Sequence, residues 1–200
     1  ENRKSIFGKG IETGAISLGL RNETNQTSGD YYLLIYQKGA WVMHMIRNML
    51  IDLKTMKEDR FITMFREFFM KYKGSSVSTL EFKRTLEKYA AMDMSWFFDQ
   101  WVHGTDIPEY KFAYKVTKTA KGHYKVLCRV KQENVPPDFK MLVPIKIDFG
   151  KKSIHRLRKM ISGETMQFEL PPLGKEPKDI IFNDLNSVLC EVDEVAWDDI

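Results

Sequence analysis

The sequence lacks a long hydrophobic run, a strong charge imbalance and a large set of cysteines. A membrane-spanning helix needs about 20 consecutive apolar residues, and no run in the chain approaches that length. Lysine and arginine exceed aspartate and glutamate only by 31 to 27, which gives a net charge of +4. Such a small and dispersed excess does not predict a nucleic-acid partner. We therefore expect neither a membrane span nor nucleic-acid binding.

The chain contains only two cysteines, Cys128 and Cys190. Each lies among apolar residues in a strand-like pattern, so we interpret both as buried free thiols. A disulfide bond between them stays open as an alternative, because one pair of cysteines does not establish the redox compartment. The sequence therefore predicts no cellular location.

Between Leu33 and about Val102 the apolar residues recur at helical spacing. Ser78-Thr79-Leu80-Glu81 has the pattern of a capping box and predicts the start of a helix. Gly104 and Pro108 predict the end of the helical part. The apolar faces of the successive predicted helices carry Trp41, Met45 and Met49; Phe61, Phe65, Phe68, Phe69 and Tyr72; Phe82, Leu86 and Tyr89; and Trp96, Phe97 and Trp101. We interpret the last of these clusters as core or inter-domain packing rather than a substrate cage.

After Pro108 the apolar period becomes two. Short alternating segments separated by turn-forming residues predict an antiparallel β-sandwich. The residues before Leu33 are polar and rich in glycine, with little periodicity. The predicted fold is therefore α+β with three parts: an irregular segment at 1–32, a helical part at 33–108 and a small β-sandwich at 109–200. The predicted strands are 110–116, 124–130, 141–149, 153–161, 165–170, 179–182 and 188–192.

Several motifs follow one another in a fixed order between Gly14 and Tyr110. They are Gly14-Ala15-Ile16-Ser17-Leu18-Gly19-Leu20-Arg21, Tyr36-Gln37-Lys38-Gly39-Ala40, Val42-Met43-His44-Met45-Ile46-Arg47, Thr79-Leu80-Glu81-Phe82 and Trp96-Phe97-Phe98-Asp99-Gln100-Trp101-Val102. Their order and spacing resemble the aminopeptidase N family of zinc metallopeptidases, the gluzincin aminopeptidases. The resemblance implies that the helical part is a remnant of a thermolysin-like catalytic domain and that the sandwich is the small β-domain that follows it.

The resemblance also implies a parent enzyme that removes N-terminal residues from peptides. In that mechanism zinc lowers the pKa of a bound water, a glutamate accepts the proton, and the hydroxide attacks the peptide carbonyl. Tyr36 matches the family's catalytic tyrosine, whose hydroxyl stabilises the oxyanion. The alternative is that Tyr36 packs under the Gly39–Ala40 turn. Tyr31 and Tyr32 match less well, because neither precedes a lysine-glycine pair.

The zinc ligands of the family are absent from the sequence. That site needs H-E-x-x-H on one helix and a glutamate on the next, because histidines four residues apart place both imidazoles on one helix face. The chain's histidines are His44, His103, His123 and His155, of which no two lie within five residues. The family's glycine-x-methionine-glutamate-asparagine strand, which binds the substrate amine, is absent as well. Both motifs precede the tyrosine in the family.

We therefore expect the chain to be a fragment of a zinc aminopeptidase from which the zinc-binding half is missing. On this interpretation the parent binds zinc and peptide, whereas the isolated chain binds no zinc and is inactive. His44 would be a hydrogen-bonded core residue, and Lys38 and Gly39 would be structural, the glycine allowing close helix approach. The fragment would expose apolar residues around Trp41–Met49 and self-associate through them. The alternative function is a non-catalytic scaffold or interaction module derived from the same family.

Overall fold

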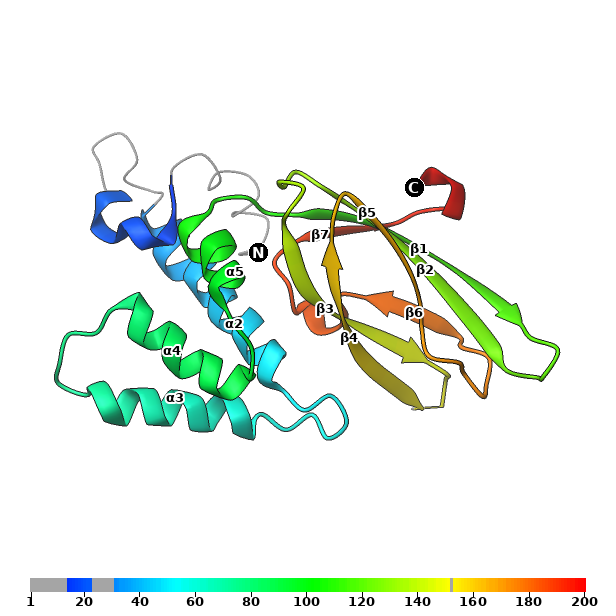
Figure 1. The fold of residues 1–200 in the computed structure, drawn as a ribbon, viewed down its shortest axis with the longest axis horizontal. Helices are drawn as coiled ribbons and strands as arrows, with labels where there is room; N and C mark the ends of the chain where they lie inside the picture. Colours follow the sequence, from blue (N-terminus) through cyan, green and yellow to red (C-terminus); the bar gives the residue numbers. More distant parts are fainter. Residues whose placement is uncertain (1–13, 23–30, 152) are drawn as a thin grey trace. The chain divides into compact units, whose positions relative to one another are not determined.

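The computed structural model describes residues 14–22, 31–151 and 153–200. The chain has an α+β fold and divides into two compact units, Glu1–Asp106 and Ile107–Ile200. The described part of the first unit is helical, and the second unit contains two β-sheets (Figure 1). The last helical residue of the first unit is His103 and the first strand of the second begins at Glu109.

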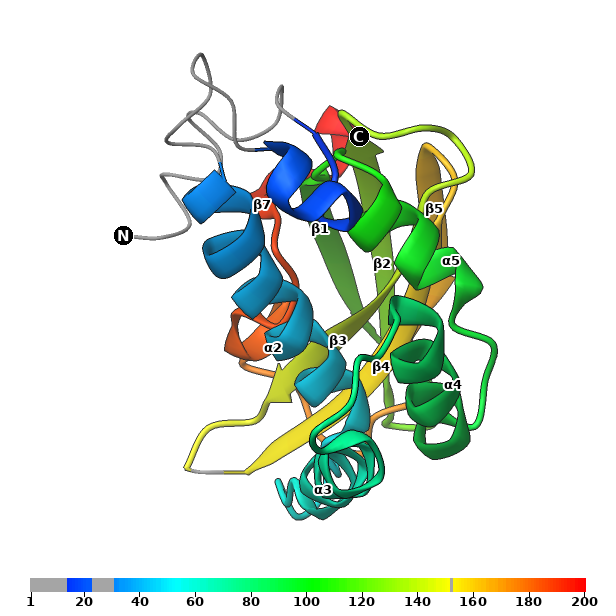
Figure 2. The ribbon, with the colours of Figure 1, turned by 90° about the vertical axis from the view of Figure 1, so that its left-hand side faces the viewer.

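The helical unit begins with η1, a 3₁₀ helix at Ile16–Asn22, within the segment expected to be irregular. Residues 1–13 and 23–30 of that segment lie outside the described residues. The following elements are η2 (Tyr32–Lys38), α2 (Gly39–Leu50), α3 (Asp59–Tyr72), α4 (Thr79–Ala90), α5 (Ser95–Phe98) and η3 (Asp99–His103). Helices α3 and α4 lie side by side (Figure 2). They run antiparallel, because Phe68 contacts Phe82 whereas Arg60 contacts Tyr89.

The predicted capping box at the start of α4 is confirmed. The backbone N–H of Ser78 donates to the Glu81 carboxylate at 3.0 Å, and the Ser78 side chain accepts from the backbone three residues on. These contacts satisfy donors that the first turn of a helix otherwise leaves free. Ala91, in the left-handed region with φ 55°, ends the helix.

The core of the helical unit confirms one expectation and corrects another. Phe97 and Trp101 are fully buried, as packing residues should be, whereas Trp96 of the same cluster is only partly buried. The expected exposure around Trp41–Met49 is wrong for its central residue, because Met45 is 0% exposed. Helix α2 contacts both α3 and α4, whereas Trp41 and Met49 are partly exposed.

The second unit is a β-sandwich. Its strands are β1 (Glu109–Lys118), β2 (Tyr124–Glu133), β3 (Lys140–Asp148), β4 (Ile154–Ser162), β5 (Thr165–Glu169), β6 (Asp179–Phe182) and β7 (Glu191–Glu194). One sheet has the order β5-β2-β1-β7 and the other β4-β3-β6. The inner faces meet where Phe112 of β1 stacks on Phe182 of β6, with ring centroids 5.0 Å apart.

The antiparallel prediction needs one correction, because β7 pairs with β1 in parallel and makes that sheet mixed. The other strand pairs are antiparallel. Alternation of apolar and polar residues indicates which face of a strand is buried, but it carries no information on strand direction.

Both cysteines lie in the sandwich as buried free thiols, which confirms the interpretation from sequence. Burial raises the pKa of Cys128 to about 12. The amide of Asn183 donates to the Cys190 sulfur at 3.1 Å.

Candidate functional site

Tyr36 lies in η2, a π-helical segment that continues directly into α2. The backbone N–H of Gly39 reaches the carbonyl of Leu34, five residues earlier, as a π-helical bond does. Turns of this kind are rare and occur frequently at functional sites. The motif that was predicted to carry the catalytic tyrosine therefore has an unusual backbone at that residue.

The Tyr36 side chain is 58% exposed. Its ring stacks on the ring of Tyr32, with centroids 5.4 Å apart, and meets the ring of Tyr31 edge-on at 6.1 Å. The ring is therefore not buried beneath the Gly39–Ala40 turn. Its hydroxyl makes no hydrogen bond to another described residue, so the phenol is held by ring contacts with its polar end available.

A surface hollow of about 300 Å³ follows Tyr36 along the same helix. Gln37, Ala40, Trp41 and His44 line it. These positions share one side of the helix, because residues three and four apart are neighbours on a helix surface. The side-chain oxygen of Gln37 is buried and has no hydrogen-bond partner among the described residues.

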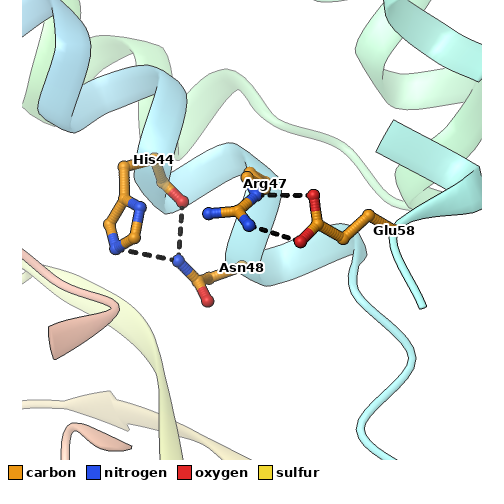
Figure 3. A network of polar contacts seen from close by, with 4 residues as sticks. All are labelled: His44, Arg47, Asn48 and Glu58. Atoms are coloured by element: carbon orange, nitrogen blue, oxygen red, sulfur yellow. Dashed lines mark hydrogen bonds and ion pairs between the residues drawn. The ribbon is translucent and has the colours of Figure 1, made fainter. Parts of the chain in front are cut away.

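His44 is held by a hydrogen bond to the next turn of α2. The Asn48 side-chain amide lies 3.0 Å from His44 Nε2 and donates to the His44 carbonyl at 2.9 Å (Figure 3). The Asn48 side chain thus contacts both the ring and the backbone of His44. The hydrogen bond agrees with the prediction for His44, but the core position does not, because the imidazole is only partly buried and borders the hollow.

Arg47 links the end of α2 to the start of α3. Its guanidinium forms a bidentate pair with the carboxylate of Glu58, with Nε donating to Oε2 at 2.7 Å (Figure 3). The hydrogen bonds from Arg47 lower the pKa of Glu58. The pair thus closes the loop between the two helices.

Lys38, two residues after Tyr36, is 2% exposed. Its ammonium group donates to the carbonyl oxygen of Gly104 at 3.2 Å. Burial lowers the pKa of Lys38 to about 8, against the opposing effect of the Asp106 carboxylate. The lysine therefore fastens the tyrosine-bearing helix to the chain that leaves η3, which is a structural role as predicted.

Gly39 and Gly104, which both lie near Lys38, differ in the space available for a Cβ atom. A Cβ on Gly104 would lie 2.6 Å from the carbonyl oxygen of Gln100, a contact with backbone that cannot move aside cheaply. Among the described residues, the nearest atom to a Cβ on Gly39 would be the Leu34 carbonyl oxygen at 3.9 Å. The close approach predicted at Gly39 is therefore wrong, and the position that needs glycine is Gly104.

No group of three or more histidine, cysteine, aspartate or glutamate side chains is placed to hold a metal within residues 14–22, 31–151 and 153–200. His44 uses Nε2 for Asn48, and His103 lies at the end of η3. The described residues thus do not fit a zinc ion. In the same ranges, each helix falls short of the length and apolar character that a membrane crossing requires.

Comparison with known proteins gives a likeness of fold. No protein-family model matches the chain, and no curated protein matches it in sequence. The structure is similar to part of Legionella pneumophila aminopeptidase A, solved in complex with aspartic acid, with a TM-score of 0.57 and 13% sequence identity. The likeness covers 79% of this chain and 17% of that chain, so the present chain spans about a sixth of the length of that protein. The shared feature is the fold.

Proposed function

We propose that this chain is part of a zinc aminopeptidase: the C-terminal portion of its catalytic domain and the β-domain that follows. The observation that carries the proposal is the structural likeness to part of an aminopeptidase, together with an exposed tyrosine on a π-helical turn. The described residues contain no zinc-binding group. The proposal therefore assigns the zinc ligands to a part of the enzyme other than these 200 residues.

The contribution of this chain to the reaction is a hydrogen bond from Tyr36. When water adds to a peptide carbonyl, negative charge develops on the carbonyl oxygen, and a donor placed in advance stabilises that charge. The Tyr36 hydroxyl is exposed and its ring is held by Tyr32, so the donor is oriented before substrate binds. A peptide whose carbonyl lies beside this hydroxyl would border the hollow lined by Gln37 and Trp41.

Tyr36→Phe in the longest reading frame that contains these residues tests the proposal. Loss of one oxyanion donor should lower kcat by about 10²–10³-fold. KM for an aminoacyl anilide should change little, because the interaction forms only in the transition state. Tyr31→Phe and Tyr32→Phe are matched controls and should each retain activity within about threefold of the parent. Equal losses in all three variants would indicate a packing role for the tyrosines.

The non-catalytic scaffold remains the second candidate, and the exposed apolar residues of α3 favour it. The reading frame itself separates the two functions. An H-E-x-x-H motif followed by a glutamate upstream of Tyr36 supports the enzyme, because those residues supply the ligands of a catalytic zinc. A complete reading frame without such a motif, and without aminopeptidase activity, supports the scaffold.

A further inference from the structure

Helix α3 carries an apolar stripe on its exposed side. Ile62, Phe65 and Phe69 are 41%, 46% and 56% exposed, whereas Met64 on the inner side is fully buried. Positions 62, 65 and 69 fall on one side of a helix. The sequence pattern placed Phe65 and Phe69 on the buried face, so the apolar arc of α3 is wider than the surface that its own unit covers.

Charged residues of opposite sign stand at the two ends of this stripe. Asp59 is the first residue of α3 and Lys73 directly follows its last residue. Both are exposed, and neither forms an ion pair with another residue in the described part of the chain. Arg66 is exposed next to Phe65 in the middle of the helix.

This arrangement is complementary to itself. A two-fold axis beside Phe65 and Arg66 makes two antiparallel α3 helices face each other. Ile62 then lies opposite Phe69 of the second copy. Asp59 lies opposite Tyr72 of the second copy, one residue before Lys73, whose long side chain can reach the carboxylate. The same axis brings Phe65 beside Phe65 of the second copy on one edge of the interface. On the other edge it brings Arg66 beside Arg66, where both exposed guanidinium groups can extend into solvent. In an antiparallel pair, the partially positive N-terminus of each helix also lies beside the partially negative C-terminus of the other.

We propose that the α3 stripe (Ile62, Phe65 and Phe69) is the interface of a symmetric dimer of this chain. In a two-fold interface the same surface of both subunits takes part, and every contact occurs twice. The opposed end charges select the antiparallel register, and the aromatic residues supply the buried apolar surface. The interface replaces the α2 face as the site of self-association, and it is independent of the catalytic role proposed for Tyr36.

Sedimentation equilibrium of the 200-residue chain tests the apolar part of the interface. The chain should dimerise, and Phe65→Glu/Phe69→Glu should raise the dissociation constant by at least about 100-fold, because two buried aromatic anchors are replaced by charges. Met92→Glu, an exposed apolar residue of the same unit outside the stripe, is the matched control and should dimerise as the parent does. Circular dichroism should show unchanged helix content in all variants.

A charge exchange tests the register. Asp59→Lys and Lys73→Asp should each weaken the dimer by about tenfold at low salt, since each turns two attractive pairs into two repulsive ones. The double variant Asp59→Lys/Lys73→Asp should restore dimerisation. A parent chain that stays monomeric at all concentrations overturns the proposal. So does a dimer that survives Phe65→Glu/Phe69→Glu, or a double exchange that fails to restore association.

Discussion

The ammonium group of Lys38 donates a hydrogen bond to the carbonyl oxygen of Gly104, although 66 positions separate the two residues in the chain. The contact joins the helix that carries Tyr36 to the point where the helical unit ends. Burial of a lysine charge costs free energy unless the group is hydrogen-bonded. The hydrogen bond ties the tyrosine-bearing segment to Gly104, and burial of the ammonium group makes the stability of the unit sensitive to pH.

The first prediction concerns that pH dependence. The folded pKa of Lys38 is about 8, and an unfolded lysine has a pKa of about 10.4. Between these values the unfolded chain binds more protons than the folded chain, so the Lys38 contribution to stability rises with pH. From about pH 7 to pH 10 the free energy of unfolding should rise by about 2–3 kcal/mol relative to Lys38→Met. Urea denaturation at several pH values measures the difference.

Lys57→Met is the matched control for Lys38, because Lys57 is an exposed lysine of the same unit. Its stability should follow that of the parent chain at every pH. Parallel profiles for the parent chain and Lys38→Met would contradict the assignment, since they would mean that Lys38 titrates alike in the folded and unfolded states.

The second prediction compares the two glycines. Gly104→Ala should destabilise the chain by about 2–4 kcal/mol, because its Cβ would overlap the Gln100 carbonyl oxygen at 2.6 Å. Gly39→Ala should stabilise it by about 0.5–1 kcal/mol, because Gly39 has helical dihedral angles and an open Cβ position. Thermal melts of both variants test the pair. Similar losses at both positions would refute the close approach assigned to Gly104.

Local sequence signals predicted much of this fold. Alternation of apolar residues located the strands to within a few residues, and the capping box located the start of α4, because both patterns act over a few neighbouring positions. The parallel pairing of β1 with β7 was missed. The direction of β7 depends on the route of the chain between β6 and β7. The alternation of apolar residues within a strand contains no information about that route.

The candidate site, too, was only partly predictable from local sequence patterns. The motif around Tyr36 was visible in the sequence, but the π-helical turn and the burial of Lys38 were not. The burial of Lys38 depends on the carbonyl oxygen of Gly104, which is far along the chain.

Phe65 and Phe69 show the opposite error, because they were expected to be buried and are exposed. Helical spacing placed them on an apolar face, but whether a partner element covers that face is decided by tertiary packing.

The third prediction concerns the capping box. Ser78→Ala removes the side-chain acceptor at the start of α4 and should cost about 1 kcal/mol. Ser76→Ala, at an exposed serine two residues earlier, should change stability by less than about 0.5 kcal/mol. Chemical denaturation followed by circular dichroism distinguishes them. If both variants unfold at the same denaturant concentration, the cap does not contribute to the stability of α4.

The fourth prediction concerns the ion pair between Arg47 and Glu58. Hydrogen bonds from Arg47 lower the folded pKa of Glu58, and an unfolded glutamate has a pKa of about 4.3. The contribution of the pair is therefore fully present above about pH 4.3 and is lost as the pH falls through the folded pKa of Glu58. Arg47→Gln should be less stable than the parent chain at neutral pH and approach it in acid. The difference should also shrink in high salt, because both side chains are partly exposed.

Arg84→Gln serves as the control for Arg47, since Arg84 is an exposed arginine on α4. Its stability relative to the parent chain should show no step in the same acid range. The measurement is urea denaturation from about pH 7 downwards, at low and high salt. A deficit of Arg47→Gln that persists unchanged in acid would contradict the ion-pair assignment. Such a result would assign the role of Arg47 to packing of its apolar stem between α2 and α3.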